Sequence, residues 1–392
     1  MCSAARNSEG SAGESAVLAV TGIGMVSPVG LDVASSCAAA RAGIRGMVGL
    51  DGFPVFDEQA VAEVPLVVHM VPHISAGLFG TARLLQLALS AIDDLRSSAR
   101  QEPAQRLGLI VVARSELHRK IWIDRVRSST VLERNGLDVE ALETDLAADQ
   151  KALADTLLPN LIRHAQIAVE PRATRTILSD QTGFITALEQ ASAWLADGTC
   201  ETCWIGGCDS YLDPPVLEAL GGLRLLHTPD HSVGLIPGEL ACFIALEDAR
   251  RLTSTSQSPR ALIHGFAREG AAIDERGDQT QVVEALVRTM SRVEAGQEPG
   301  LILVNLNGDP TRALEWGRVQ IRRALQGVRG QPPFWVPPLY FGEIGAATGP
   351  ASVALLAQGW ARGYAPASRA TVCMMEESSS RGAFSVSARG ES

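Results

Sequence analysis

The chain has 392 residues, of which 46% are hydrophobic and 20% charged, a composition typical of a globular protein with a large core. Its net charge of −10 disfavours nucleic acids and anionic membranes as general partners, and its apolar runs are too short to cross a bilayer. The odd number of cysteines, seven in scattered positions, is typical of reduced thiols in a cytosol. Residues 1–15 are small and polar and lack the apolar core of a signal peptide, so we expect a flexible tail and a cytoplasmic protein.

The first part of the chain alternates strand and helix patterns. An apolar strand and a Gly/Ser/Pro turn occupy 16–29, an Ala-rich helix ends at Gly43, and an amphipathic helix covers 81–97. The run "RLGLIVVARS" predicts a strand buried on both faces. Residues 115–170 are more polar and helical, and we expect them to form an inserted layer outside the main core.

The stretch "RTILSDQTGFITALEQASAWLADG", residues 175–198, predicts a strand, a sharp turn and a long helix. Such a junction can hold a nucleophile, because the helix start offers free N–H groups and positive potential. The residue at the turn is Asp180, a weak nucleophile. Either its carboxylate caps the helix by accepting the N–H of Thr182 or Gly183, or it acts as a catalytic acid or base.

The remaining patterns repeat this alternation. Strands are predicted in "ETCWIGGCDSYL", "GELACFIALEDARRL", "ALIHGFARE", "GLILVNLNGDP" and, as the last one, "ASRATVCMMEE", with helices at 278–294 and in "GPASVALLAQG". The polar segment "TSTSQSPR" separates two halves, 16–252 and 260–388. The pattern favours a mostly parallel α/β architecture.

Three motifs suggest ligands but fit them poorly. Gly22, Gly24 and Gly30 lack the spacing of a dinucleotide-binding loop. The cysteines of "TCETCWIGGC" have no fourth zinc ligand nearby, and the histidine pair of "HTPDHSVG" is more typical of a polar turn than of a metal site. We therefore expect neither a metal nor a cofactor.

Four segments, taken in order, resemble the β-ketoacyl-acyl carrier protein synthases, which have the thiolase-like fold. They are "VTGIGMVSPVG", "TGFITALEQASAWLADGTCETCWIGGCDS", "GLIPGELACFIALEDARR" and "GEIGAATGPASVALLAQG". The resemblance extends from about residue 16 to 388. It implies a five-layered α-β-α-β-α unit of two similar halves. It also implies a homodimer in which the strand Ala173–Leu178 pairs with its twin.

The family's chemistry requires a Cys nucleophile and two His residues, and all three positions differ here. The resemblance places Asp180 at the nucleophile position, Asn307 at the first His and Glu343 at the second. The family's lysine falls near Pro338, and "MEESSSRGAF", residues 375–384, lacks the glycine run of the family's gating loop. An Asp cannot form the thioester, and Glu343 brings negative charge to where an enolate must form.

Two functions follow from this degenerate triad. The favoured one is a non-catalytic scaffold, chaperone or partner subunit, with a secreted effector of a type VI secretion system or an active synthase as the partner. In the second case the chain would resemble a chain-length factor, and an acyl carrier protein is a weaker candidate partner. The alternative is an acyltransferase by family membership, or a divergent enzyme that uses Asp180 and Glu343 as a carboxylate pair. An acyl-sized pocket between the three residues would favour the enzyme, and a plugged tunnel the scaffold.

Overall fold

The computed structural model describes residues 17–98, 106–129, 136–252, 258–270, 280–297, 299–328 and 330–389. The expected tail, 1–15, lies outside these ranges, as does most of the segment expected to separate the two halves. No helix within the described ranges is long and apolar enough to span a membrane.

Ten strands form two similar halves of one sheet. The N-terminal half has the order β5-β4-β6-β7-β1 and the C-terminal half the order β10-β9-β11-β12-β8. The strands of the first half are β1 (Leu18–Val26), β4 (Leu107–Ala113), β5 (Thr174–Leu178), β6 (Thr202–Ser210) and β7 (Glu239–Asp248). Those of the second are β8 (Ala261–Gly270), β9 (Leu301–Val304), β10 (Phe334–Trp335), β11 (Arg369–Met375) and β12 (Ser380–Ser387). Within the sheet, the two halves are joined by three residue pairs between β1 and β8. We therefore describe the halves as two five-stranded sheets.

The two halves also share the direction of every pairing. In each, the second strand along the chain lies parallel to the third and the fourth, and the remaining pairs are antiparallel. The expectation of a mostly parallel sheet was therefore wrong for half of the pairings within each unit. The antiparallel partner β12 follows β11 after a short turn, and the sequence analysis, whose last strand was "ASRATVCMMEE", did not predict it.

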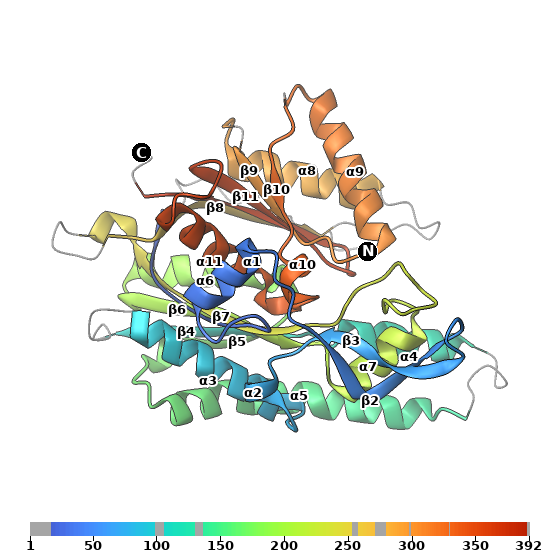
Figure 1. Ribbon diagram of the computed structural model, residues 1–392. Helices are drawn as coiled ribbons and strands as arrows, with labels where there is room; N and C mark the ends of the chain where they lie inside the picture. The colour runs from blue at the N-terminus through green and yellow to red at the C-terminus, as the bar shows by residue number, and fades with distance from the viewer. Residues whose placement is uncertain are drawn as a thin grey trace, which may run out of the picture.

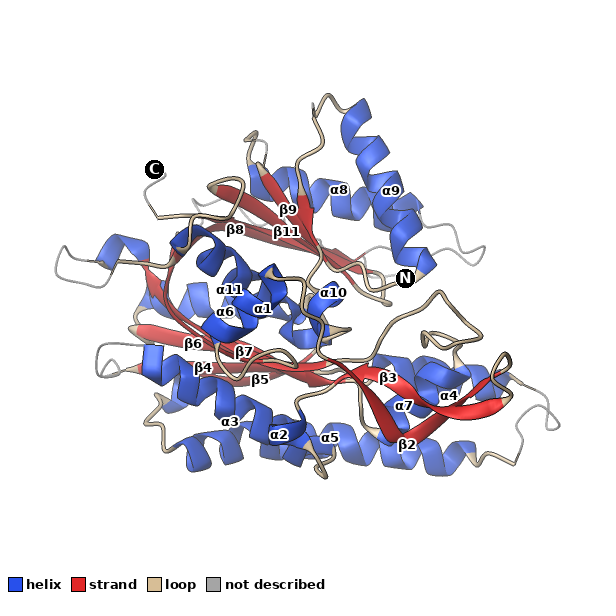
Figure 2. Cartoon of the chain, viewed as in Figure 1, coloured by secondary structure: helices blue, strands red, loops and turns tan. Residues whose placement is uncertain are grey.

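Helices form three layers around the two sheets, as Figures 1 and 2 show. The outer layers contain α3 (Gly80–Ser98) and α5 (Val139–Ala165) on one side and α8 (Thr280–Glu294) and α9 (Pro310–Leu325) on the other. The central layer contains α1 (Val33–Arg41), α6 (Gly183–Asp197) and α11 (Thr348–Ala361). Buried apolar clusters lie on both faces of the two sheets, which confirms the five-layered thiolase-like architecture.

The stretch 115–170 was expected to be an insertion, but α5 does not fit that description. It connects β4 to the parallel β5, as α9 connects β9 to β10, and its leucines are buried against the outer face of the sheet. Among the described residues of this stretch, α4 (Leu117–Ser128) is the additional helix. It lies in a side lobe with α7 (Pro214–Gly222) and the hairpin β2 (Met47–Asp57) and β3 (Ala62–His69), and this lobe has its own apolar cluster.

The remaining helices are short. They are α2 (Pro72–Ser75), α10 (Pro338–Phe341) and three 3-10 turns at Pro171–Ala173, Ala249–Arg251 and Gly345–Ala347. Along the chain, α10 and the 3-10 turn Gly345–Ala347 connect β10 to α11. They therefore determine where the residues before α11 are placed.

Candidate functional site

The candidate site lies where the parallel strands of both halves end, which is where open α/β sheets bind ligands. Asp180 follows β5 and Asn307 follows β9. Glu343 lies between α10 and the 3-10 turn that precedes α11. The turn between β11 and β12 adds Glu376 and Glu377. We call Asp180, Glu343, Glu376 and Glu377 the carboxylate cluster. All four side chains are largely or wholly withdrawn from water.

Glu343 is fully engaged by donors. Its Oε1 accepts from Gln181 Nε2 at 3.0 Å and from the Gly345 N–H at 3.0 Å. Its Oε2 accepts from Asn307 Nδ2 at 2.6 Å and from Arg312 Nη1 at 2.8 Å. Because both oxygens are occupied, the carboxylate has little capacity left to exchange a proton with a substrate. The structure thus brings Asn307 and Glu343 together in a mutual hydrogen bond.

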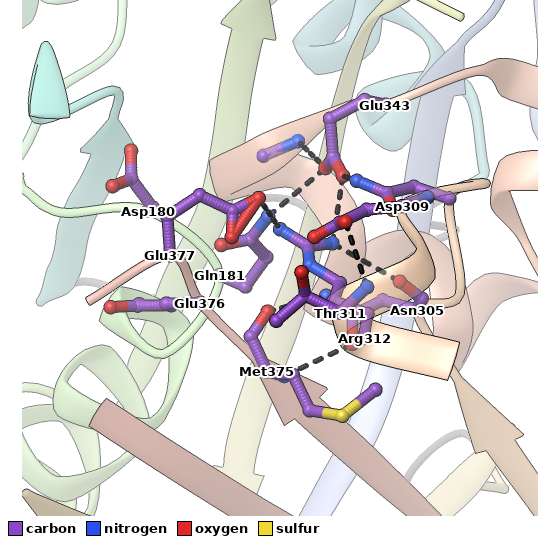
Figure 3. A network of polar contacts seen from close by, with 12 residues as sticks. Asp180, Gln181, Asn305, Asp309, Thr311, Arg312, Glu343, Met375, Glu376 and Glu377 are labelled. Atoms are coloured by element: carbon purple, nitrogen blue, oxygen red, sulfur yellow. Dashed lines mark hydrogen bonds and ion pairs between the residues drawn. The ribbon is translucent and has the colours of Figure 1, made fainter. Parts of the chain in front are cut away.

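Arg312 is the cation of the site, and the sequence patterns missed it. Besides Glu343, it binds Glu377 Oε1 through Nη2 at 2.8 Å, and it is only 2% exposed. Burial raises the pKa of Glu377, but Arg312 and His118 outweigh burial and lower that pKa to about 2. Figure 3 shows the dashed contacts converging on Glu343 and Arg312, with none joining Asp180 to Glu343.

Asp180 does not cap α6, so that prediction was wrong. Its carboxylate points instead to the segment that follows β4, where it accepts hydrogen bonds from the Ser115 N–H at 3.2 Å and from Ser115 Oγ at 2.7 Å. Burial raises the pKa of Asp180 to about 6, and the Glu376 carboxylate adds to the rise, whereas His118 and Ser115 oppose it. The described contacts of Asp180 include no arginine or lysine.

Glu376 takes the position that we expected for Asp180. Its Oε1 accepts the N–H of Thr182, the residue that precedes the first turn of α6, at 2.6 Å, and its Oε2 accepts from Ser378 Oγ at 2.7 Å. A carboxylate there complements the positive end of the helix. The other half repeats the arrangement, since Asp209 at the end of β6 accepts the Ala346 N–H before α11 at 2.9 Å. A carboxylate from the opposite half therefore accepts a backbone N–H next to the start of α6 and of α11.

A buried ion pair holds the turn that carries Glu376 and Glu377. Arg381 Nε and Nη2 bind the two oxygens of Glu315 on α9 at 2.6 and 2.8 Å. Its Nη1 donates to the carbonyls of Glu376, Ser378 and Ser380 at 2.9, 2.7 and 2.7 Å. The segment 375–384, which the resemblance aligned with a gating loop, is thus the end of β11, a pinned turn and the start of β12.

His118 lies beside the cluster, in a hollow too small for an acyl chain. Its Nε2 is 3.7 Å from Glu377 Oε1, beyond hydrogen-bonding distance. Burial lowers the pKa of His118, but the carboxylates of Glu377, Asp180 and Glu343 together outweigh burial and raise it. The hollow lined by Asp180, His118 and Tyr211 has a volume of about 10 Å³, room for about one water molecule.

Sequence reasoning missed four residues of this site: His118, Arg312, Glu376 and Glu377. One of them left a signal in the sequence. Asp309 and Pro310 mark the start of α9, which places Arg312 in the first turn, where the helix dipole disfavours a cation. An arginine at that position is informative because it needs a compensating acid, and Glu343 and Glu377 provide two. His118 and the glutamates left no comparable signal.

The described residues include no group of three His, Cys, Asp or Glu side chains arranged to hold a metal. The absence of metal and cofactor stays a prediction.

The chain is similar to known proteins in its fold and not detectably in its sequence. No protein-family model matches the chain, and no curated protein matches its sequence. Solved structures do. The ishigamide ketosynthase/chain length factor has a TM-score of 0.64 at 18% identity and covers 95% of this chain and 100% of its own. The ketosynthase from module 6 of the bacillaene synthase of Bacillus subtilis has a TM-score of 0.70 at 12% identity, over 96% of this chain and 72% of its own.

A third similar structure is a type II polyketide ketosynthase bound to the hexaketide, in complex with its acyl-carrier protein. It has a TM-score of 0.62 at 14% identity and covers 95% of this chain and 99% of its own. Identities at this level establish shared architecture and no more. The chain therefore has, over about 95% of its length, the thiolase-like fold of the ketosynthases and chain-length factors.

Proposed function

We propose that the chain is a non-catalytic, ketosynthase-like protein that works by binding a protein partner. The observation that carries this proposal is the Glu343–Arg312–Asn307 cluster, which fills the positions of the family's two histidines with a closed set of mutual bonds. Condensation and malonyl decarboxylation both need donors aimed at a developing enolate. Here the donors are already bound to Glu343.

The nucleophile position supports the same conclusion. Asp180 cannot form the acyl thioester, and the Glu376 carboxylate already occupies the start of α6, where an oxyanion would otherwise be stabilised. The hollow beside Asp180 holds about one water. An acyl-sized pocket between Asp180, Asn307 and Glu343 would have favoured an enzyme, whereas a site filled by side chains favours a scaffold.

The alternative enzyme with an Asp180–Glu343 pair has less support. The two carboxylates share no described contact, and Gln181 binds Glu343 while Asp180 binds Ser115. The elevated pKa of Asp180 would suit an acid or base, but the group faces a hollow with room for about one water molecule.

The partner that the fold supports best is an active synthase, with this chain in the place of a chain-length factor. One similar structure is described as a ketosynthase/chain length factor. Strand β5 lies at the edge of the sheet, so its free edge can pair with a second chain, either this one or a related synthase. A type VI secretion accessory would also act by binding, with a secreted effector in place of the synthase. Binding of an acyl carrier protein is the weakest of these proposals.

Three measurements test the proposal. Malonyl-carrier decarboxylation and condensation by the purified chain should stay at the no-protein background, and turnover that disappears in Asp180→Ala would overturn the non-catalytic assignment. Affinity purification at native abundance, followed by mass spectrometry, should then recover a synthase. Recovery of a secreted effector would instead support the type VI role. Light scattering at micromolar concentration should show a homodimer or a heterodimer, and a stable monomer would contradict pairing at β5.

A further inference from the structure

A separate cavity, which shares no lining residue with the carboxylate cluster, lies between α1, α10 and α11. It is lined by residues of α1, of β10 and α10, and of α11 with the turn that follows it: Cys37, Ala40, Arg41, Trp335, Tyr340, Leu355 and Tyr364. Its volume is about 210 Å³. An apolar cavity of about 150 Å³ is known to bind benzene in another protein, so this one has room for a single substituted ring.

Aromatic side chains form the wall of the cavity. Trp335 and Tyr364 face each other with ring centroids 6.1 Å apart. Gly359 of α11 makes this approach feasible, because a Cβ there would lie 3.0 Å from the Trp335 ring and 3.3 Å from the Tyr364 ring. Trp335, Tyr340 and Tyr364 are each only partly buried, whereas Cys37 and Leu355 are buried. The cavity therefore has aromatic walls and an apolar floor, as small-molecule sites usually do.

The charged side chain that lines the cavity is Arg41. Arg41 is exposed, and its guanidinium carbon lies 4.2 Å from the centre of the Tyr364 ring. Stacking on a ring leaves the in-plane N–H groups of a guanidinium free to bind a carboxylate in a bidentate manner. Among the described residues, no carboxylate forms an ion pair with Arg41.

Two further groups support an anionic ligand. Burial raises the pKa of Tyr364, while Arg41 and Arg362 both act to lower it, which places a second cation nearby. Burial, together with the carboxylates of Asp32 and Asp94, raises the pKa of the Cys37 thiol to about 12, so the thiol itself is uncharged. Three aromatic rings could also form a cage for a quaternary ammonium group, but two neighbouring arginines would repel such a cation.

We propose that this cavity is a binding site for a small aromatic carboxylate, with the ring between Trp335 and Tyr340 and the carboxylate on Arg41. None of its lining residues belongs to the carboxylate cluster, so this binding is independent of the proposed partner function.

The test uses 4-fluorobenzoate as the probe and the fluorine NMR signal of the probe as the readout, with the full-length protein. Wild type should broaden and shift the signal in a saturable way. Arg41→Met should weaken binding by about tenfold or more, since a charge-assisted bidentate contact is lost. Arg322→Met, an exposed arginine of α9, is the matched control and should bind as wild type does.

Competition identifies the ligand class. Unlabelled benzoate should displace the probe, and benzyl alcohol should do so at least about tenfold less well because it lacks the carboxylate. Displacement by benzyltrimethylammonium in preference to benzoate would overturn the assignment in favour of an aromatic cage. Trp335→Leu should also abolish binding, with a thermal melt as the check on folding. Saturable binding that Arg41→Met and Trp335→Leu both leave unchanged, or no binding at all, would refute the site.

Discussion

The two halves place a buried acid at equivalent points, and they treat it in opposite ways. Asp180 follows the third strand of the first half, and Glu343 follows the third strand of the second. Glu343 receives Arg312 and three neutral donors, whereas Asp180 receives only Ser115 and faces Glu376. A shared fold position thus does not determine the electrostatic surroundings of a side chain. Those surroundings depend on the nearest compensating charge, and burial penalises a carboxylate that lacks one.

The largest expected effect comes from removing that compensating charge. Arg312→Met leaves Glu343 and Glu377 buried without a cation, and we expect it to lower the free energy of unfolding by about 3–5 kcal/mol. The measurement is denaturant unfolding at pH 7. The exposed variant Arg322→Met should change the value by less than about 0.5 kcal/mol. A loss below about 1 kcal/mol in Arg312→Met would show that the two halves do not differ as described.

Neutralising the two acids should have effects of opposite sign. The pKa of Asp180 is raised from 3.8 to about 6, so the folded state binds more protons between these values and stability falls as pH rises through the window. Asp180→Asn should therefore raise the free energy of unfolding at pH 7 by about 1–3 kcal/mol, with the gain vanishing below pH 4.

Glu343→Gln is the matched variant in the other half, and it should destabilise the protein at pH 7 because Arg312 loses a charged partner. Unfolding of both variants is followed by denaturant titration at pH 4 and pH 7. If Asp180→Asn lowers stability at pH 7, the carboxylate has a favourable partner that the structure does not show.

The cap of α6 should have a smaller effect. Glu376→Ala removes the acceptor of the Thr182 N–H and should cost about 0.5–2 kcal/mol. Both Glu376→Ala and Glu376→Gln remove the charge that raises the pKa of Asp180. Because Glu376→Gln keeps an oxygen that can accept the Thr182 N–H, it should cost less stability than Glu376→Ala. Thermal or denaturant unfolding at pH 7 ranks the two. The reverse order would argue against a capping role.

The smallest effect concerns Ser115, the partner of Asp180. Ser115→Ala removes the hydroxyl that favours the charged form, and should cost about 0.5–1.5 kcal/mol. It should also raise the pKa of Asp180 further, since Ser115 acts to lower it. Carboxyl carbon NMR of the labelled protein measures that pKa directly. An unchanged titration midpoint would mean that the hydroxyl does not stabilise the Asp180 carboxylate.

Much of the fold was predictable because it depends on local patterns. The apolar run of β4 and the spacing in α3 specify a buried strand and an amphipathic helix. Gly43, with φ of +73°, follows α1 where the sequence predicted its end, since a glycine adopts that conformation without strain. The resemblance assigned Asp180, Asn307 and Glu343 to the three catalytic positions of the family, and the structure brings Asn307 and Glu343 into contact.

The sequence by itself determined most of the strands and helices and their alternating order along the chain. Only the tertiary structure decided the electrostatics. Glu376 lies 194 residues from Thr182, and Arg312 lies 31 residues from Glu343 and 65 from Glu377, so no local pattern could link them. For the same reason the expected cap by Asp180 failed. A helix N-terminus binds whichever acceptor the folded chain brings to it, and a rigidly held turn of the other half supplied a better-placed carboxylate.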